Sequence, residues 1–224
     1  MKILIGITGA SGSIYAERLL QELAPIESVE KIYVVATESG ASVARFELAA
    51  QKVSEGKKKD RETKALCLLK ILQKKIPSEL SHKIFVFRND DFYAPPASGS
   101  SVPSHMIVVP CSMGSLARIR HGLSQNLLER SADVVLKEGR QLVICPRESP
   151  FGIIHLENML GLAKMGAKIM PLMPAFYQKP KDLKECIDFM VGKILEGLGL
   201  KHSLYPPWAI DRTTKREVQD GGLA

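Results

Sequence analysis

The sequence has few cysteines, and they are far apart. Its 224 residues include four, Cys67, Cys111, Cys145 and Cys186, and no C-x-x-C pair. This spacing argues against a disulfide framework or a zinc site. It favours buried thiols in a reducing compartment, so we expect a cytoplasmic protein.

Long apolar runs are also missing. No run approaches the roughly 20 residues that a membrane-spanning helix needs, and the apolar start MKILIGITGASG is too short and glycine-rich for a signal peptide. The net charge is +7, but much of the excess lies in residues 57–59 and in the tail. Because such charge runs are usually solvated surface, nucleic-acid binding is not favoured.

Short apolar segments alternate with helical patterns along the chain, which indicates a parallel sheet covered on both faces. The predicted strands are 2–8, 31–36, 83–87, 106–109, 142–145 and 167–170, and the predicted helices are 13–23, 61–73, 127–137, 155–163 and 183–198. Residues 88–104 form the one long loop. We therefore predict a single α/β domain over residues 1–210, a three-layer sandwich with a doubly wound, mainly parallel sheet. A polar tail follows at 211–224.

The turn after the first strand, residues 8–13 (TGASGS), is rich in glycine and hydroxyl groups. Such turns let a ligand approach the backbone, and helix N-termini attract phosphate. The dinucleotide fingerprint G-x-G-x-x-G is absent, however, and Tyr15 stands where its third glycine would fall. The Y-x-x-x-K pattern of reductases occurs only at Tyr177 and Lys181, where Pro180 interrupts the helix. A mononucleotide beside Ser11 therefore fits better than NAD(P).

A second turn of small polar residues follows the fourth strand and opens a helix, PCSMGSL at 110–116. N-capping by Ser112 or Ser115 is the structural alternative. A third small-residue segment, APPASGSS, lies at 94–101. Together these segments indicate a binding site, and ligands of open α/β sheets bind at the carboxyl ends of the strands.

The segment QLVICPRESPF at 141–151 runs from a buried strand directly into Arg147 and Glu148. Pro146 and Pro150 flank this pair and restrict its backbone. A rigid surface turn with a solvated ion pair is the structural alternative to a functional site.

The motifs TGASG, APPASGS, PCSMGSL, LLERSADVVLKE, PRESPFGIIHLENM and PAFYQKP occur in this order. From about residue 2 to Trp208 the chain resembles the UbiX/Pad-type flavin prenyltransferases. The resemblance implies a flavodoxin-like (Rossmann-like), FMN-binding fold, in a superfamily that also contains homo-oligomeric cysteine decarboxylases. It implies transfer of a dimethylallyl group from dimethylallyl phosphate to N5 and C6 of reduced FMN, without a metal. The prenylated FMN would serve a UbiD-type decarboxylase in ubiquinone biosynthesis or aromatic acid decarboxylation.

The resemblance also assigns residues to the two ligands. It places FMN against Gly9, Ala10, Ser11, Thr37, Ser112, Met113, Gly114, Ser115 and Arg130. It places the prenyl donor against Ser98, Gly99, Ser100, Lys137, Arg147, Glu148, Tyr177, Lys193 and Trp208. Two positions depart from the family, which usually has serine at Thr37 and arginine at Lys193. A lysine keeps the charge but loses the bidentate fork.

Four residues would carry the chemistry: Ser11, Glu47, Lys137 and Glu148. Lys137 and the other cations would stabilise the leaving phosphate, each charged hydrogen bond contributing roughly 1.5–3 kcal/mol when desolvated. Glu148 would give the phosphate a proton, because nearby negative charge raises the pKa of a carboxyl group. Ser11, relayed to Glu47, would remove the flavin ring proton.

Each of these assignments has a structural alternative. Lys137 stands at a helix end, where cations are favourable in any case. Glu47 can be a solvated helix residue, Trp208 a packing anchor after two prolines, and His155 a helix cap or core residue.

Two other functions stay open. One is an FMN-dependent decarboxylase acting directly on an aromatic or 3-polyprenyl-4-hydroxybenzoate carboxylate. The related cysteine decarboxylases need a histidine soon after the first turn, whereas the first histidine here is His82. The other is a non-catalytic flavin carrier, which would have no use for the cationic cluster. The resemblance further implies trimers assembled into a dodecamer, with Arg130 or the loop at Ser98 serving a neighbour's FMN.

Overall fold

The computed structural model describes residues 1–48, 68, 72 and 75–206. Most of the helix predicted at 61–73, the residue Trp208 and the tail at 211–224 lie outside the described residues.

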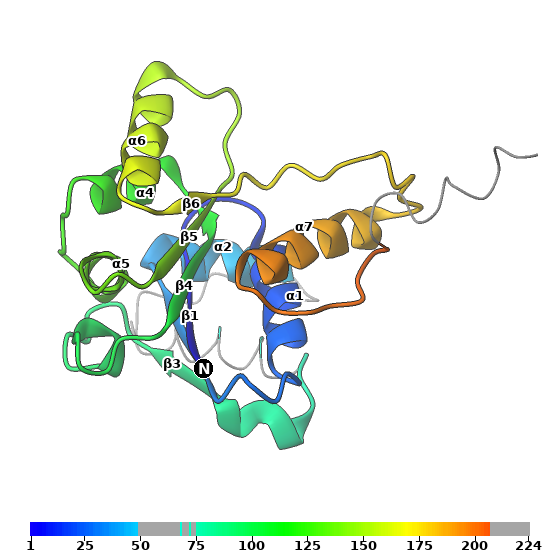
Figure 1. The fold of residues 1–224 in the computed structure, drawn as a ribbon, viewed down its shortest axis with the longest axis horizontal. Coiled ribbons are helices and arrows are strands. Elements are labelled where there is room, and N and C mark those ends of the chain that lie inside the picture. Colours follow the sequence, from blue (N-terminus) through cyan, green and yellow to red (C-terminus); the bar gives the residue numbers. More distant parts are fainter. Residues whose placement is uncertain (49–67, 69–71, 73–74, 207–224) are drawn as a thin grey trace, which may run out of the picture.

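Six strands form one sheet, and every neighbouring pair is parallel. The strands are β1 (Lys2–Ile7), β2 (Lys31–Ala36), β3 (Ile84–Phe87), β4 (His105–Cys111), β5 (Gln141–Pro146) and β6 (Lys168–Ile169). Their order is β3-β2-β1-β4-β5-β6 (Figure 1). The chain builds one half of the sheet from β1 outward to β3 and then crosses back to β4, so the switch point of the sheet lies between the neighbouring strands β1 and β4. The predicted doubly wound sheet is confirmed, and ligands of such sheets bind at this switch point.

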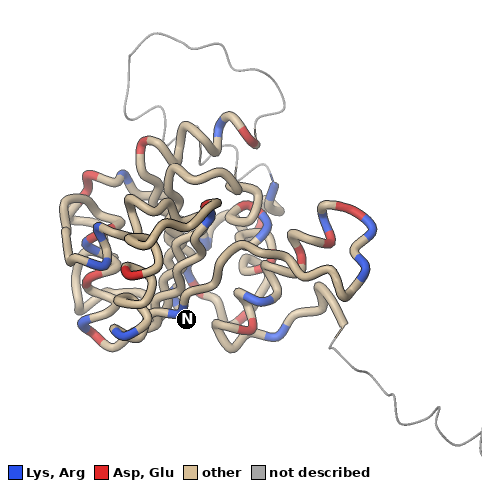
Figure 2. Tube along the Cα trace, turned by 90° about the horizontal axis from the view of Figure 1, so that it is seen from above, with Lys and Arg blue, Asp and Glu red and all other residues tan. Residues whose placement is uncertain are grey.

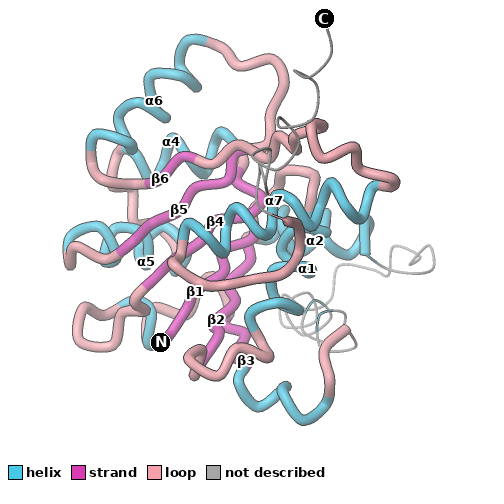
Figure 3. The backbone as a smooth tube through the Cα atoms, turned by 45° about the vertical axis from the view of Figure 1, so that its right-hand side comes forward, coloured by secondary structure: helices cyan, strands magenta, loops and turns pink. Residues whose placement is uncertain are grey.

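Helices cover both faces of the sheet (Figure 3). On one face lie α1 (Ser13–Leu23), α2 (Glu38–Leu48) and α7 (Leu183–Gly197), and on the other α4 (Met113–Arg120), α5 (Leu127–Lys137) and α6 (Ile153–Lys164). Because successive strand side chains point to opposite faces, Ile3, Ile5 and Ile7 pack toward the first group and Leu4 toward the second. Burying each such side chain contributes about 1.5–3 kcal/mol.

The elements α1, β2 and α5 begin and end at the predicted residues. Helix α2 was not predicted, because its sequence ESGASVARFEL contains glycine and serines of low helix propensity. Its start is held by close packing on β1, since a Cβ on Gly40 would lie 2.4 Å from the carbonyl oxygen of Ile7. The predicted long loop contains a short 3₁₀ turn, η2 (Pro95–Ala97), and another, η1 (Ser78–Lys83), precedes β3.

Charged positions of both signs are spread over the described residues (Figure 2), and of their side chains Glu17, Glu129 and Asp188 are buried. Among the helices of the described residues, none is long and apolar enough to cross a membrane.

Candidate active site

Two turns lie side by side at the carboxyl ends of β1 and β4, and Thr8 joins them. The buried Thr8 hydroxyl donates to the carbonyl oxygen of Pro110 at 2.8 Å and accepts from the Ser112 amide at 2.7 Å. Its own amide also donates to Pro110, at 3.2 Å. These bonds fix the turn at residues 9–12 against the turn at residues 112–115, at the switch point of the sheet.

Thr37 brings a third hydroxyl-bearing turn to the same edge. Its hydroxyl accepts from the Gly40 amide at 3.0 Å and lies 3.2 Å from Ser39 Oγ. Gly9 packs so closely on this turn that a Cβ there would lie 2.6 Å from Ser39 Oγ. Since the first amides of a helix have no intrahelical partner and attract anions, the start of α2 suits a phosphate group beside the Gly9 turn.

Glu47 reaches from the last turn of α2 to the N-terminus of α1. Its carboxylate accepts from the amides of Gly12, at 3.1 Å, and Ser13, at 2.8 Å. Gly12 has a φ of 113°, in the left-handed region that favours glycine. Burial raises the pKa of Glu47, but hydrogen bonds from the Ser11 hydroxyl and these amides lower it by more, so the net shift is downward. The proton relay from Ser11 to Glu47 stays a prediction.

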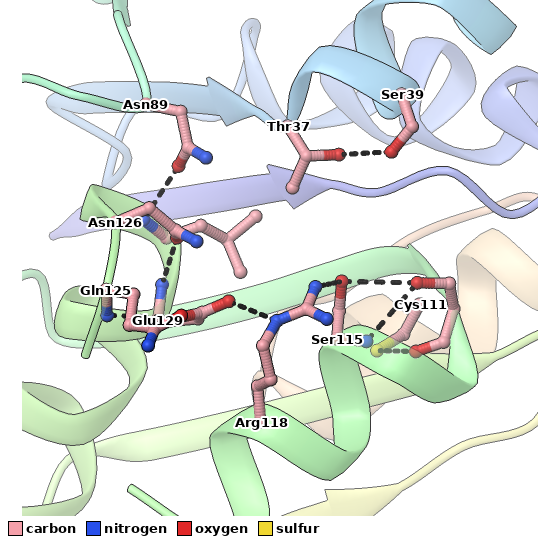
Figure 4. A network of polar contacts seen from close by, with 11 residues as sticks. Thr37, Ser39, Asn89, Cys111, Ser115, Arg118, Gln125, Asn126 and Glu129 are labelled. Atoms are coloured by element: carbon pink, nitrogen blue, oxygen red, sulfur yellow. Dashed lines mark hydrogen bonds and ion pairs between the residues drawn. The ribbon is translucent and has the colours of Figure 1, made fainter. Parts of the chain in front are cut away.

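Ser112 opens α4 and begins a partly buried polar network, whose members Ser115, Arg118 and Glu129 are drawn in Figure 4. Its hydroxyl accepts from the Ser115 amide at 3.4 Å and donates to Ser115 Oγ at 3.1 Å, which confirms the predicted cap. Arg118 then links Ser115 Oγ, at 3.3 Å, to the buried carboxylate of Glu129, at 2.5 Å. The ion pair between Arg118 of α4 and Glu129 of α5 therefore holds the turn at 112–115 in place through Ser115.

Arg147 and Glu148 make separate contacts at the end of β5. Arg147 Nε donates to the carbonyl oxygen of Ser11 at 3.1 Å, and the Arg147 amide donates to that of Cys111 at 3.2 Å. Glu148 Oε1 instead accepts from the Ser149 amide at 3.0 Å. Both side chains are exposed, and Arg147 is directed at the first turn rather than at its neighbour.

The third predicted group, Arg130, Lys137 and residues 98–100, lies on the outer side of α5. Arg130 donates to the carbonyl oxygen of Ala97 at 3.2 Å and pairs with Asp133 at 2.9 Å. Lys137 Nζ lies 2.7 Å from Glu138 Oε1, and a Cβ on Gly99 would lie 2.4 Å from the same oxygen. Gly99 therefore makes room for the Glu138 carboxylate.

Lys137 and Arg147 lie at opposite ends of the strands, Lys137 at the amino ends and Arg147 at the carboxyl ends. Lys137 ends α5, just before the amino end of β5, whereas Arg147 follows the carboxyl end of that strand. The six residue steps from Gln141 to Arg147 correspond to about 20 Å. With Arg147 directed at Ser11 and Lys137 at Glu138, a single chain holds the two cations apart. The predicted cationic cluster is not assembled within one chain.

Tyr177 and Lys193 form a further group at α7. The Tyr177 ring meets Phe189 edge to face, with centroids 5.8 Å apart, and Lys193 pairs with Glu196. The predicted contact Trp208 lies outside the described residues. His155 accepts from the Gly152 amide at 3.1 Å and so caps α6, the structural role expected for it.

A cavity of about 180 Å³ opens at the carboxyl ends of β2 and β3. Thr37, Asn89, Gln125 and Asn126 contribute polar groups, and apolar side chains such as Phe92 complete the lining. Whole-ligand pockets are usually about 300–1,000 Å³, so this cavity alone is smaller than a nucleotide-sized ligand requires. In the part of the chain that the structure describes, no group of three or more His, Cys, Asp or Glu side chains could hold a metal ion.

Sequence reasoning missed several residues of this edge: Thr8, Ser39, Asn89, Arg118 and Glu129. Ser39 could have been found from the sequence. Thr37 precedes Gly40 by three residues, the spacing of a helix N-cap and the amide that it binds, and Ser39 lies in the turn between them. Arg118 and Glu129 belong to different helices, and nothing in the sequence predicts that those helices meet.

Comparison with known proteins first gives the class. The model of the family described as Flavoprotein matches residues 1–196. Among solved structures, a dodecameric FMN-dependent UbiX-like decarboxylase from Escherichia coli O157:H7 is 35% identical, with a TM-score of 0.77, covering 93% of this chain and 100% of that one. A second, AnUbiX (PadA1) in complex with FMN and dimethylallyl pyrophosphate, is 32% identical, also with a TM-score of 0.77, covering 93% and 97%.

The curated relatives then give the particular family. Flavin prenyltransferase UbiX of Halalkalibacterium halodurans is 46% identical over 93% of both chains. The UbiX of Methanocaldococcus jannaschii is 41% identical over 93% of this chain and 98% of its own. This chain belongs to the UbiX flavin prenyltransferase family, as its motifs predicted. The cysteine decarboxylase TvaF, 14% identical with a TM-score of 0.52, shares the fold alone.

Proposed function

We propose that this protein transfers a dimethylallyl group from dimethylallyl phosphate to N5 and C6 of reduced FMN, giving prenylated FMN. One observation carries the proposal: Arg147 donates to the carbonyl oxygen of Ser11, and Glu47 accepts from the amides of the next two residues, Gly12 and Ser13. This supports roles for Glu47 as a proton acceptor and for Arg147 as a phosphate-binding cation at the switch point. A carrier that only held FMN would need neither.

The residues at this edge suit FMN. Residues 9–11 offer a backbone surface, the hydroxyls of Thr37 and Ser39 suit the phosphate at the start of α2, and the turn at 112–115 suits a polar ring edge. When bound, the reduced flavin supplies the nucleophilic ring atoms. Every other step falls to side chains of the protein.

Ser11 and Glu47 would remove the ring proton. Hydrogen bonds lower the pKa of the Glu47 carboxyl group below its ordinary value, so Glu47 is ionised at neutral pH and able to take a proton. Ser11 would take the proton from the ring carbon while passing its own hydroxyl proton to Glu47. This relay needs no metal.

The prenyl phosphate would bind between subunits. Arg147 and Glu148 come from one chain, and because Lys137 lies at the far edge of the sheet, a second copy would supply it. Arg130 and residues 98–100, on the same side of α5, would accompany Lys137 and face the neighbour's FMN. Tyr177 and Lys193 would complete the donor site.

An apolar face on α6 supports such an assembly. Ile153, Ile154, Leu156 and Leu160 are all more than half exposed, and contiguous apolar surface of this kind usually marks an interface. Since one similar structure is described as dodecameric, we propose trimers assembled into a homododecamer. We further propose that the enzyme is cytoplasmic, consistent with free thiols at the three described cysteines. A UbiD-type decarboxylase would receive the product.

The proposal is tested by the fate of the donor phosphate. With reduced FMN under anaerobic conditions, the protein should release inorganic phosphate from dimethylallyl phosphate, and omission of FMN should abolish the release. A flavin carrier would release none. The decarboxylase alternative predicts instead that CO₂ forms from an aromatic carboxylate without any donor. Parallel reactions with dimethylallyl diphosphate would identify the preferred donor.

A further inference from the structure

Lys193 occupies a position where a flexible side chain is at a disadvantage. It projects from α7 and is 44% exposed. An arginine would bring a planar fork that is already oriented for phosphate, whereas a lysine is a point charge on four rotatable bonds. If Lys193 is to hold the donor phosphate in one place, other residues must fix its ammonium group.

Glu196, one turn further along α7, does this. One carboxylate oxygen pairs with Lys193 Nζ, and the other accepts from the Tyr205 hydroxyl at 2.6 Å and lies 3.4 Å from His202 Nε2. The Leu204 amide donates to His202 Nδ1 at 3.2 Å, which places the ring proton on Nε2, toward Glu196. Burial raises the pKa of Glu196, but hydrogen bonds from Lys193 and Tyr205 lower it by more. The net shift of the pKa is downward, so this carboxylate is ionised at neutral pH.

Tyr205 is itself held rigidly against α7. Its ring lies 5.0 Å from that of Phe189 and 4.8 Å from that of His202, centroid to centroid. Gly192 makes this possible, because a Cβ there would lie 2.4 Å from the Tyr205 ring. At the next residue, Gln178 Nε2 donates to the carbonyl oxygen of Pro206 at 3.1 Å, which fixes the segment to the chain beside Tyr177.

The same aromatic cluster also contacts Tyr177. Phe189 lies between the two tyrosines, edge to face with Tyr177 at 5.8 Å and tilted against Tyr205. Tyr177 and Lys193, the two residues of α7 and its approach expected to touch the donor, are therefore fixed by one group of side chains.

We propose that Glu196 and Tyr205 are positioning residues, which hold the Lys193 ammonium in the orientation that the donor phosphate requires. One of the three N–H bonds of the ammonium group is used by Glu196, and two remain for phosphate oxygens. The inference rests on the proposed function, because it assumes that Lys193 binds the prenyl phosphate.

The test is the affinity of the full-length protein, loaded with oxidised FMN, for dimethylallyl phosphate, measured by calorimetry. Tyr205→Phe removes one hydroxyl and keeps the ring stack. It should weaken donor binding roughly threefold to tenfold, the range for one charged hydrogen bond at a partly exposed site. FMN affinity should not change. Tyr93→Phe, at a fully exposed tyrosine, is the matched control and should leave donor binding intact.

Two further variants sharpen the test. Glu196→Gln should also weaken donor binding. If it instead bound the donor more tightly, Glu196 would merely neutralise Lys193, and the inference would be wrong. In a Lys193→Arg background, the effect of Tyr205→Phe should shrink, since the fork needs less support.

The donor affinities of the wild type and of Tyr205→Phe distinguish failure of the inference from failure of the proposed function. Equal donor affinity in wild type and Tyr205→Phe would overturn the positioning role alone. A wild-type protein that does not bind dimethylallyl phosphate at all would overturn both.

Discussion

Mixing two inactive variants tests whether the donor site is shared between subunits. Lys137→Met and Arg147→Met each remove one cation from the proposed phosphate site. A lost charged hydrogen bond of about 1.5–3 kcal/mol lowers the rate roughly tenfold to a hundredfold. Each variant alone should therefore be nearly inactive at limiting donor.

The structure sets the expected recovery. The two cations lie at opposite edges of one sheet, about 20 Å apart along β5. If each site takes Arg147 from one copy and Lys137 from another, random co-assembly of equal amounts leaves about a quarter of the sites with both cations. The co-expressed mixture, purified by two different tags, should thus regain about a quarter of wild-type activity.

The control is the same experiment with Lys137→Met carrying both tags, which should regain nothing. The reasoning would be refuted if the mixed Lys137→Met and Arg147→Met assemblies were no more active than the two variants alone. Both cations would then have to act from one chain, against the placement that the strand requires.

Further predictions concern single residues. Gly9→Ala should destabilise the protein by about 1–3 kcal/mol through overpacking on Ser39, and Ser39→Gly should relieve the clash and restore the stability; thermal unfolding measures this. Burial raises the pKa of Glu17, so the folded protein binds this proton more tightly and loses stability as pH rises. Glu17→Gln should therefore raise Tm more at mildly alkaline than at mildly acidic pH, and an equal shift at both would contradict the assignment. Glu148→Gln should slow adduct formation while FMN still binds, whereas loss of FMN binding would place Glu148 in the wrong site. Glu47→Gln should leave the donor affinity unchanged and slow closure of the new ring, followed as flavin absorbance in single turnover.

Elements with their own sequence signals were predictable. Helix α5 begins after Asn126, whose side chain caps the Glu129 amide at 3.0 Å, and its apolar residues repeat with helical period. The hydroxyl-rich turns after β1 and β4 were visible in the sequence because runs of small polar residues directly follow apolar strands. The motifs then supplied the family, which the comparisons confirm.

What escaped prediction depends on tertiary contacts. Helix α2 gains its stability from close packing of Gly40 on β1, not from its own propensity. The separation of Lys137 from Arg147 follows from strand direction, and the order of motifs in the sequence carries no such information. Glu196 and Tyr205 are nine residues apart, and only the fold of residues 202–206 against α7 brings them together.

The mass of the flavin tests the central claim most directly. The protein is mixed anaerobically with reduced FMN and dimethylallyl phosphate, and the flavin is released and weighed. The account predicts a flavin heavier by one five-carbon prenyl unit, formed only when protein, reduced FMN and donor are all present. A flavin of unchanged mass would contradict it.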